Sequence, residues 1–325
     1  MAEAPLTSDA LNQYLLDHLV RYTDLVPCTT AFIDTRTPGS EEKENFTIIG
    51  PGVAENPNQH VHIKRPHGFN IGGARQPPRC INSQHNHLTA EVFTVLSGQW
   101  IFTSGEAGED GRVELGPGDT ISIPTNCFRG FENVGDVPGF LFAVLGGDDP
   151  GRVLWAPYVF DMAQEYGLVL LESGELIDTA AGEEVPQDAT VMPVTSAAEV
   201  ASLDRLDSAA LERCVVRHSS LRTRAHSLPG QGIAESPIIG TGPLQWPHGF
   251  SVSHMVVDSE GSSAVYVSDE AEVFLMYAGE LTVNIRGNDI ILKSGDVFTA
   301  EAGQLRTLSN TSAQPCEVYV VRGGD

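Results

Sequence analysis

Short apolar runs that alternate with polar residues fill most of residues 60–147. The runs EVFTVLSG, QWIFTSG, RVELGPGD and TISIPTN follow one another, separated by turns rich in Gly, Pro and Asp. Alternation with a period of two is typical of strands that bury one face, and several such strands in close succession indicate an antiparallel barrel or sandwich. The pattern therefore predicts an all-β domain over this stretch.

Helical spacing marks the N-terminal flank of this region. Leucines recur three and four residues apart behind a capping hydroxyl at Thr7 or Ser8. We expect an amphipathic helix from there to about Tyr22, packed on a barrel wall or on a partner subunit. Residues 34–59, which are rich in Pro, Gly and charged residues, are expected to form an exposed loop.

A mixed, partly helical connector is predicted over residues 148–240. Pro157 suits the first turn of a helix that ends before Gly167, and LVLLESGELID is expected to form a hairpin. Ser196 and Glu199 have the spacing of a capping box at the start of a short helix, and SAALERCVV predicts a second one.

The charge of the chain limits its partners. A net charge of -24 at pH 7 argues against binding to nucleic acid, because a phosphate backbone would be repelled. No apolar run approaches the ~20 residues of a membrane span, and a signal-peptide pattern is missing, so we expect no membrane partner and a cytoplasmic location. The five scattered cysteines suit free thiols better than disulfides.

The stretch INSQHNHLTAEVFTVLSG carries the candidate chemistry. His85 and His87 are two residues apart, so on a strand both imidazoles leave the same face, and Glu91 can return to that face after a short bend. Two imidazoles and a carboxylate that converge on one point form a facial ligand set for a divalent metal.

This spacing resembles the first motif of the cupin superfamily, in which HxH is followed by a Glu and then a Gly. His85, His87, Glu91 and Gly98 match that motif position for position. The resemblance implies a double-stranded β-helix, or jelly-roll, barrel. It also implies one bound divalent metal ion.

The second cupin motif is only partly present. Gly118, Pro124 and Asn133 fit it, whereas Asn126 stands in place of the usual Gly. Arg129 occupies the position of the His that serves as the fourth metal ligand in the family, and an arginine, which stays protonated, cannot be a ligand.

The C-terminal part of the chain repeats the front half. PHGF occurs at residues 66–69 and 247–250, and Glu91 corresponds to Glu272 at an offset of 181. In the second motif, Arg129 corresponds to Arg306 at an offset of 177. Such a repeat resembles two-domain cupins, or bicupins. The expected organisation is an N-terminal helix and extension (1–59), a site-bearing barrel (60–147), the connector (148–240) and a degenerate barrel (241–325).

The two copies differ at the metal motif. Tyr266 and Ser268 replace the two histidines in the second copy, so the motif predicts a metal only in the first. Glu272 and Arg306 are nevertheless retained, which an inward-facing ion pair would explain. By analogy Arg129 is expected to pair with Glu91, in competition with a metal, to hold a substrate carboxylate or phenolate, or to do both.

The leading hypothesis is a metal-dependent oxidoreductase, an Fe(II) dioxygenase that acts on a small anionic or phenolic compound. Fe(II) suits a set of two histidines and one carboxylate, with Mn, Ni, Cu and Zn as alternatives. Arg129 is the expected catalytic residue, and the expected substrate contacts are Arg75, Gln84, Trp100 and Arg129.

Two alternatives remain open. One is a non-redox metal-dependent cupin, namely an isomerase, lyase or decarboxylase. The other is a non-catalytic ligand-binding bicupin without metal. A homodimer is the default assembly, both by resemblance and because two-fold assembly is common.

Overall fold

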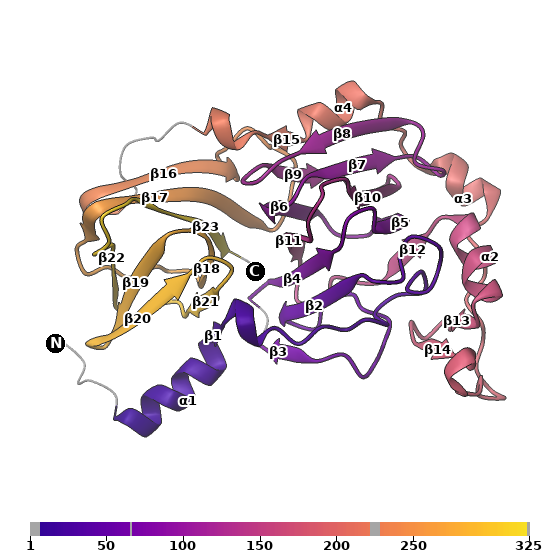
Figure 1. Cartoon of the computed structure of the whole chain (residues 1–325), viewed down its shortest axis with the longest axis horizontal. Helices are drawn as coiled ribbons and strands as arrows, with labels where there is room; N and C mark the ends of the chain where they lie inside the picture. Colours follow the sequence, from indigo (N-terminus) through magenta and orange to yellow (C-terminus); the bar gives the residue numbers. More distant parts are fainter. Residues whose placement is uncertain (1–6, 66, 222–227, 324–325) are drawn as a thin grey trace. The chain divides into compact units, whose positions relative to one another are not determined.

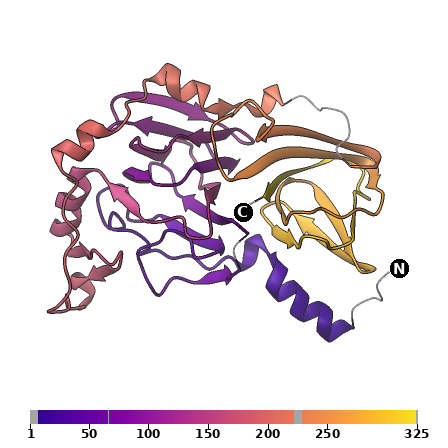
Figure 2. The same cartoon turned by 180° about the vertical axis from the view of Figure 1, so that it is seen from behind.

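The chain divides into two compact units. The computed structural model describes residues 7–65, 67–221 and 228–323. The central unit comprises residues 26–61 and 70–218, and the terminal unit combines the described residues up to 25 with residues 62–69 and those from 219 onward. Each unit is built on curled antiparallel sheets (Figures 1 and 2). The prediction of an all-β chain is confirmed.

Two large sheets form the barrel of the central unit. The first has the order β12-β5-β10-β7-β8, with β5 (Ile81–His87), β7 (Trp100–Ser104), β8 (Gly111–Leu115), β10 (Arg129–Asn133) and β12 (Val153–Trp155). The second has the order β15-β9-β6-β11-β4-β2, with β2 (Glu44–Ile49), β4 (Phe69–Gln76), β6 (Glu91–Ser97), β9 (Thr120–Ile123), β11 (Gly139–Gly146) and β15 (Val215–Val216). The short strand β3 (Val61–Ile63) lies where the two units meet in the sequence.

The expectation of an exposed loop over residues 34–59 is wrong. Strand β2 lies inside this segment and pairs with β4 in the register Asn45↔Ala74. Lys43, just before β2, is fully buried and forms an ion pair with Asp34, which is also fully buried. Charged residues marked the segment as exposed in the sequence, but their mutual neutralisation lets them lie inside.

The helical predictions in the connector are confirmed. Helix α2 (Pro157–Glu165) begins with the proline, Gly167 follows it in the left-handed conformation at φ 75°, and β13 (Leu168–Leu170) pairs with β14 (Leu176–Asp178). Helix α3 (Ala197–Ser202) has the capping box of Ser196 and Glu199. Helix α4 (Ser208–Arg213) ends earlier than predicted, because Val215 and Val216 pair with β9. Short 3₁₀ turns occupy Tyr22–Asp24, Thr179–Ala181 and His218–Ser220.

One sheet forms the terminal unit, in the order β1-β21-β18-β23-β17-β22-β19-β20 with β16 beside β17. Its strands are β1 (Leu19–Val20), β16 (Gly230–Ile239), β17 (Phe250–Ser263), β18 (Glu272–Ala278), β19 (Glu280–Ile285), β20 (Asn288–Lys293), β21 (Val297–Ala300), β22 (Arg306–Ser309) and β23 (Cys316–Gly323).

The N-terminal helix α1 (Ser8–His18) belongs to this terminal unit. Thr7 caps it by accepting a hydrogen bond from the Ala10 amide at 3.4 Å, as predicted. The helix ends four residues before Tyr22, because Leu19 and Val20 leave it to pair with β21 as strand β1. Tyr14 and Leu15 pack against the core of the unit, as the barrel-wall alternative requires, whereas Leu16 is 70% exposed.

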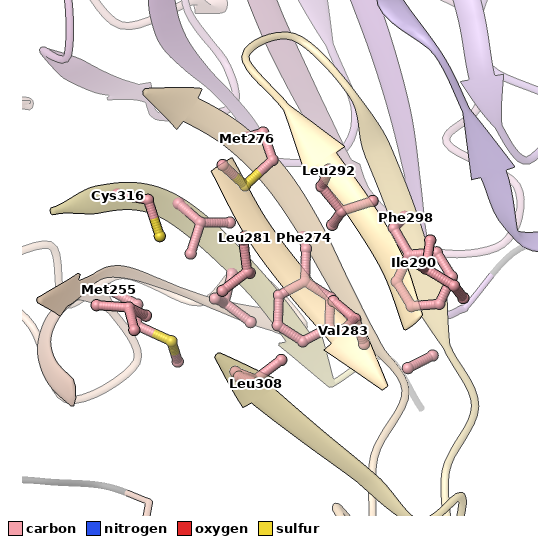
Figure 3. Close-up of a cluster of buried hydrophobic side chains, with 14 of the residues drawn as sticks. Met255, Phe274, Met276, Leu281, Val283, Ile290, Leu292, Phe298, Leu308 and Cys316 are labelled. Carbon is pink, nitrogen blue, oxygen red and sulfur yellow. The ribbon is translucent and has the colours of Figure 1, made fainter. Parts of the chain in front are cut away.

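Alternate residues of the terminal strands build one apolar core (Figure 3). Phe274 and Met276 on β18 and Leu281 and Val283 on β19 point into the interior of the curled sheet, as the two-residue period requires. Each such side chain contributes roughly 1.5–3 kcal/mol through burial. Packing in this core stabilises the strands that carry the second copy of the cupin-like motif, including Glu272 and Arg306.

A buried ion-pair network takes the place of a metal motif in the terminal unit. Arg306 donates from Nε to Glu272 Oε2 at 2.8 Å, and Arg322 donates from Nε to Glu272 Oε1 at 2.5 Å. The Tyr266 hydroxyl donates to Glu272 at 3.0 Å, and Arg322 also pairs with Glu235. The predicted inward-facing pair of Glu272 and Arg306 is confirmed.

No described helix is long and apolar enough to cross a membrane.

Replacing Glu272 with Ala is expected to lower the free energy of unfolding by about 3–5 kcal/mol, because two buried guanidinium groups lose their common acceptor. Denaturant unfolding measures this change. Glu280→Ala is the matched control, because Glu280 pairs with Lys293 at the surface at 3.2 Å and such pairs contribute less than about 1 kcal/mol. Equal losses of unfolding free energy in the two variants would contradict the role of Glu272 as the common acceptor of the two arginines.

Candidate metal centre

Strand β5 delivers two histidines to the interior of the central unit. The alternation predicted from the sequence holds, since His85 and His87 are 3% and 2% exposed and their ring centroids are 4.9 Å apart. Strand β5 is fixed on both sides, by β12 in the register His85↔Trp155 and by β10 in the register His85↔Arg129. The two imidazoles are therefore held by a paired strand instead of a loop.

Glu91 reaches the same point from the facing sheet, where it is the first residue of β6. Its Oε1 lies 3.4 Å from His87 Nε2, and its Oε2 lies 3.9 Å from His85 Nε2. One ligand-type atom of each of the three residues lies within 4.8 Å of the others. The predicted triad is brought together, and its donor set suits a divalent metal.

Hydrogen bonds favour the His85 tautomer that a metal ligand needs. His85 Nδ1 lies 2.8 Å from the Ser83 carbonyl, which can only accept, so Nδ1 carries the proton. The Asn82 amide nitrogen is farther from Nδ1, at 3.3 Å, and cannot donate to a protonated nitrogen. His85 Nε2 is left with its lone pair directed away from Ser83, toward the side where Glu91 lies.

His87 is less constrained by the protein. Among the described residues its buried Nδ1 has no hydrogen-bond partner. Burial and the positive charge of Arg129 hold the pKa of His87 well below its usual range, and they lower the pKa of His85 to about 3. Both imidazoles are neutral at pH 7, which is the form that ligates metals.

Glu91 is the anionic member of the triad. Burial raises the pKa of Glu91 to about 6, while the charge and hydrogen bond of Arg129 oppose this rise. The carboxylate is therefore mostly ionised at pH 7, and it faces two imidazoles that carry no charge.

Arg129 contacts the triad through one nitrogen. Its Nε donates to Glu91 Oε2 at 3.3 Å, and its Nη1 donates to Asn86 Oδ1 at 3.0 Å and to the Cys127 carbonyl at 3.3 Å. Its buried Nη2 has no hydrogen-bond partner among the described residues. The predicted pairing of Arg129 with Glu91 is present, but it is looser than the 2.8 Å bond between Arg306 and Glu272.

A search of protein families finds a match to the cupin domain at residues 74–145 and again at residues 253–322. The chain therefore contains two cupin domains. A germin-like protein, subfamily 1 member 4, of Arabidopsis thaliana is 28% identical over 124 residues, which cover 35% of this chain and 54% of that protein. The chain thus spans about half the length of this relative.

Solved structures share the fold of this cupin protein at low sequence identity. Oxalate decarboxylase of Lactobacillus farciminis matches with a TM-score of 0.57 and 11% identity, covering 94% of this chain and 86% of that one. Vicilin of hazelnut, Corylus avellana, matches with a TM-score of 0.54 and 15% identity over 95% and 86%. Salicylate 1,2-dioxygenase of Pseudaminobacter salicylatoxidans matches with a TM-score of 0.50 and 14% identity over 79% and 71%. Neighbours of this fold thus include a decarboxylase and a dioxygenase as well as a vicilin, and these likenesses show the fold alone.

A cavity opens onto the triad inside the central cupin domain. Its volume is about 70 Å³, and its wall includes His85, His87 and Glu91. Small wall residues on β4 and β11, such as Gly72 and Ala143, leave space for this cavity between the two sheets. A polar-ended cavity of this volume holds several water molecules or a small ring compound.

The four residues predicted to contact substrate lie outside the cavity wall. Arg75 is held by Glu44 and stacks over Phe46, on the face of β4 opposite to Ala74. Gln84 donates to Thr103 at 2.7 Å. For Arg75 and Gln84 a substrate contact stays a prediction.

The other two of the four are fully buried behind the wall. Trp100 donates to the Ser97 carbonyl at 2.9 Å and stacks edge-on against Phe131. Arg129 is 0% exposed and reaches the triad only through Glu91.

Trp155 is a wall residue that the sequence did not single out. It pairs across from His85, and their rings are 5.4 Å apart. Its indole nitrogen donates to Glu55 at 2.6 Å, and the other Glu55 oxygen accepts from the Ile33 amide at 2.7 Å. Trp155 follows the barrel in the sequence, so only the pairing of β12 with β5 could have identified it.

A buried ion pair supports the same wall. Lys43 pairs with Asp34 and donates to Asn82 at 3.2 Å, while Asp34 accepts from the Ser83 amide at 3.0 Å. These contacts fix residues 82 and 83, which in turn contact the His85 ring. No spacing in the sequence indicated this support.

Stability is expected to fall as pH rises from about 5 to 8, because burial raises the pKa of Glu55 to about 8. The folded state keeps a proton that the unfolded chain loses near its usual pKa, so this group lowers the free energy of unfolding by up to about 1.4 kcal/mol per pH unit. Glu55→Gln should remove that slope, although its amide also disturbs the bond to Ile33. Denaturant unfolding at several pH values measures the free energy of unfolding of the unaltered protein and of Glu55→Gln. Equal pH dependence in the two proteins would contradict the assignment of this slope to Glu55.

Replacing Arg129 with His is expected to raise the affinity for Zn(II) or Co(II) at least tenfold, because it removes a cation and adds a neutral nitrogen donor. Equilibrium dialysis measures the affinity. Arg129→Leu is the matched control, since it removes the charge without adding a ligand. If the His variant binds no more tightly than the Leu variant, position 129 does not face the metal.

Proposed function

We propose that this two-domain cupin is a metal-dependent oxidoreductase, an Fe(II) dioxygenase that acts on a small anionic or phenolic compound. The observation that carries the proposal is the convergence of two neutral imidazoles and a carboxylate at the wall of a cavity. This donor set is the one that non-heme iron oxygenases use.

In the proposal His85, His87 and Glu91 hold the metal. The neutral state of both imidazoles supports it, because no proton then competes for their lone pairs at pH 7. Held by these three residues, Fe(II) would supply the redox chemistry with dioxygen that the side chains themselves lack. Mn, Ni, Cu and Zn remain alternatives that reconstitution distinguishes.

The residues of the chain have three further tasks. The Ser83 carbonyl orients His85, as outer partners of metal ligands do. Arg129 balances the charge of Glu91, which is its proposed role in the catalytic site. The apolar wall keeps bulk water from the reacting atoms and so strengthens each electrostatic contact in the site.

The contact between Arg129 and Glu91 favours a second candidate, a ligand-binding bicupin without metal. In that case the guanidinium alone neutralises the carboxylate. A third candidate keeps the metal as a Lewis acid in a non-redox isomerase, lyase or decarboxylase.

A cytoplasmic location and a homodimer are further parts of the proposal. The five cysteines are free thiols, which supports a reducing compartment. Two-fold assembly is the commonest for soluble proteins.

Anaerobic reconstitution of the purified protein should give one equivalent of Fe(II) per chain, and oxygen electrodes should then record uptake with a phenolic substrate. His87→Ala is expected to lose both, because two protein ligands do not hold the ion. His60→Ala is the matched control, since His60 is exposed and lies outside the triad.

Other results of this experiment would support one of the two alternative functions. Turnover with Zn(II) and without oxygen supports the non-redox cupin. Less than one equivalent of metal, together with an unaffected His87→Ala variant, supports the metal-free binding protein and overturns the proposal.

A further inference from the structure

The cavity wall of the central domain has a one-sided distribution of charge. Among the described residues that line it, the ionisable side chains are those of the triad, and none is a lysine or an arginine. Arg129 and Lys43 are both 0% exposed, and each is already paired with an acid, Arg129 with Glu91 and Lys43 with Asp34. An anionic group away from the triad would therefore meet no counter-charge.

Aromatic side chains make up much of the rest of the wall. They come from both sheets and from a flanking segment, and they are Phe32, Phe93, Phe131 and Trp155. Such a wall suits a flat ring, because aromatic rings attract one another in edge-to-face and offset-stacked contacts beyond the burial of their area. Burying an isolated carboxylate there would instead be unfavourable, because its hydration is lost without a compensating partner.

One polar side chain of the wall has an unused hydrogen-bond donor. Asn45 Nδ2 is buried and has no partner among the described residues. The amide of Asn70, by contrast, is occupied by Gly52 and Gly147. Asn45 thus offers a donor to a neutral acceptor oxygen such as a hydroxyl, ether or carbonyl.

Asn45 and Glu91 stand well apart in the sheet. Asn45 is on β2 and Glu91 is on β6, with β4 and β11 between them. Three strand spacings amount to roughly 14 Å before the curl of the sheet shortens the distance. The wall between them is apolar and lined by small residues such as Gly72 and Ala143.

From these observations we infer that the cavity selects uncharged aromatic ligands with hydroxyl groups at one edge, and that it rejects ligands carrying a carboxylate or phosphate elsewhere on the ring system. The hydroxyl edge faces His85, His87 and Glu91, and an acceptor oxygen at the other end takes the Asn45 amide. The inference deepens the proposed function and rests on it for the orientation of the hydroxyl edge.

Calorimetric titration of the Zn(II)-loaded and metal-free protein tests the inference without turnover. The probes are two matched pairs, 4-methylcatechol with 3,4-dihydroxybenzoate and 2,3-dihydroxynaphthalene with 6,7-dihydroxy-2-naphthoate. Both members of a pair present the same hydroxyl edge and differ only in the remote carboxylate. We expect the neutral member to bind at least tenfold more tightly.

Asn45→Lys adds a cation to the wall and should improve binding of the carboxylates at least tenfold. Asn58→Lys is the matched control, because Asn58 is exposed and outside this wall, and it should leave the preference unchanged. Thermal unfolding checks that the variants fold. If Asn45→Lys does not fold, the paired ligands on the unaltered protein decide.

Equal or tighter binding of the carboxylates overturns the inference, and so does the failure of all four probes to bind at millimolar concentration. A clear preference for the neutral probes without any oxygen uptake keeps the inference and removes the dioxygenase proposal. Oxygen uptake together with a preference for the carboxylate probes keeps the dioxygenase proposal and overturns the inference.

Discussion

A carboxylate buried at the start of a strand requires donors or positive charge around it, and both cupin domains meet this requirement at equivalent positions. In the terminal domain Glu272 is satisfied by two guanidinium groups and a phenol hydroxyl. In the central domain Glu91 receives one hydrogen bond from Arg129, at 3.3 Å, and otherwise faces two imidazoles. The first carboxylate is saturated by protein groups, whereas the second is surrounded by groups that a cation would draw together.

The repeat made this contrast predictable in outline. Alternation along β5 placed His85 and His87 on one face, and the offset of 181 identified Glu272 as the counterpart of Glu91. The same parity rule explains why Gln84 lies away from the cavity, since it is one residue from His85 on the strand. Arg75 likewise alternates with the wall residue Ala74.

Other features could not be deduced because they depend on contacts between distant segments. Trp155 enters the wall only through the pairing of β12 with β5. Lys43 and Asp34 resembled an exposed charged loop, yet each makes the burial of the other tolerable. The reach of Arg322 to both Glu272 and Glu235 also crosses long stretches of sequence. Local spacing carries no information on such contacts.

The electrostatics of the central domain reconcile an apolar cavity with a charged site. With both imidazoles neutral, a divalent ion beside Glu91 and Arg129 would leave a surplus of positive charge confined to one end of the cavity. A suitable ligand places no charge against the apolar wall and brings negative charge to the triad. A ligand that is neutral along its rings and loses protons only from hydroxyl groups at that end meets both of these conditions. A ligand with a fixed remote anion satisfies only one of them, because the neutralising charge lies at the wrong end of the wall.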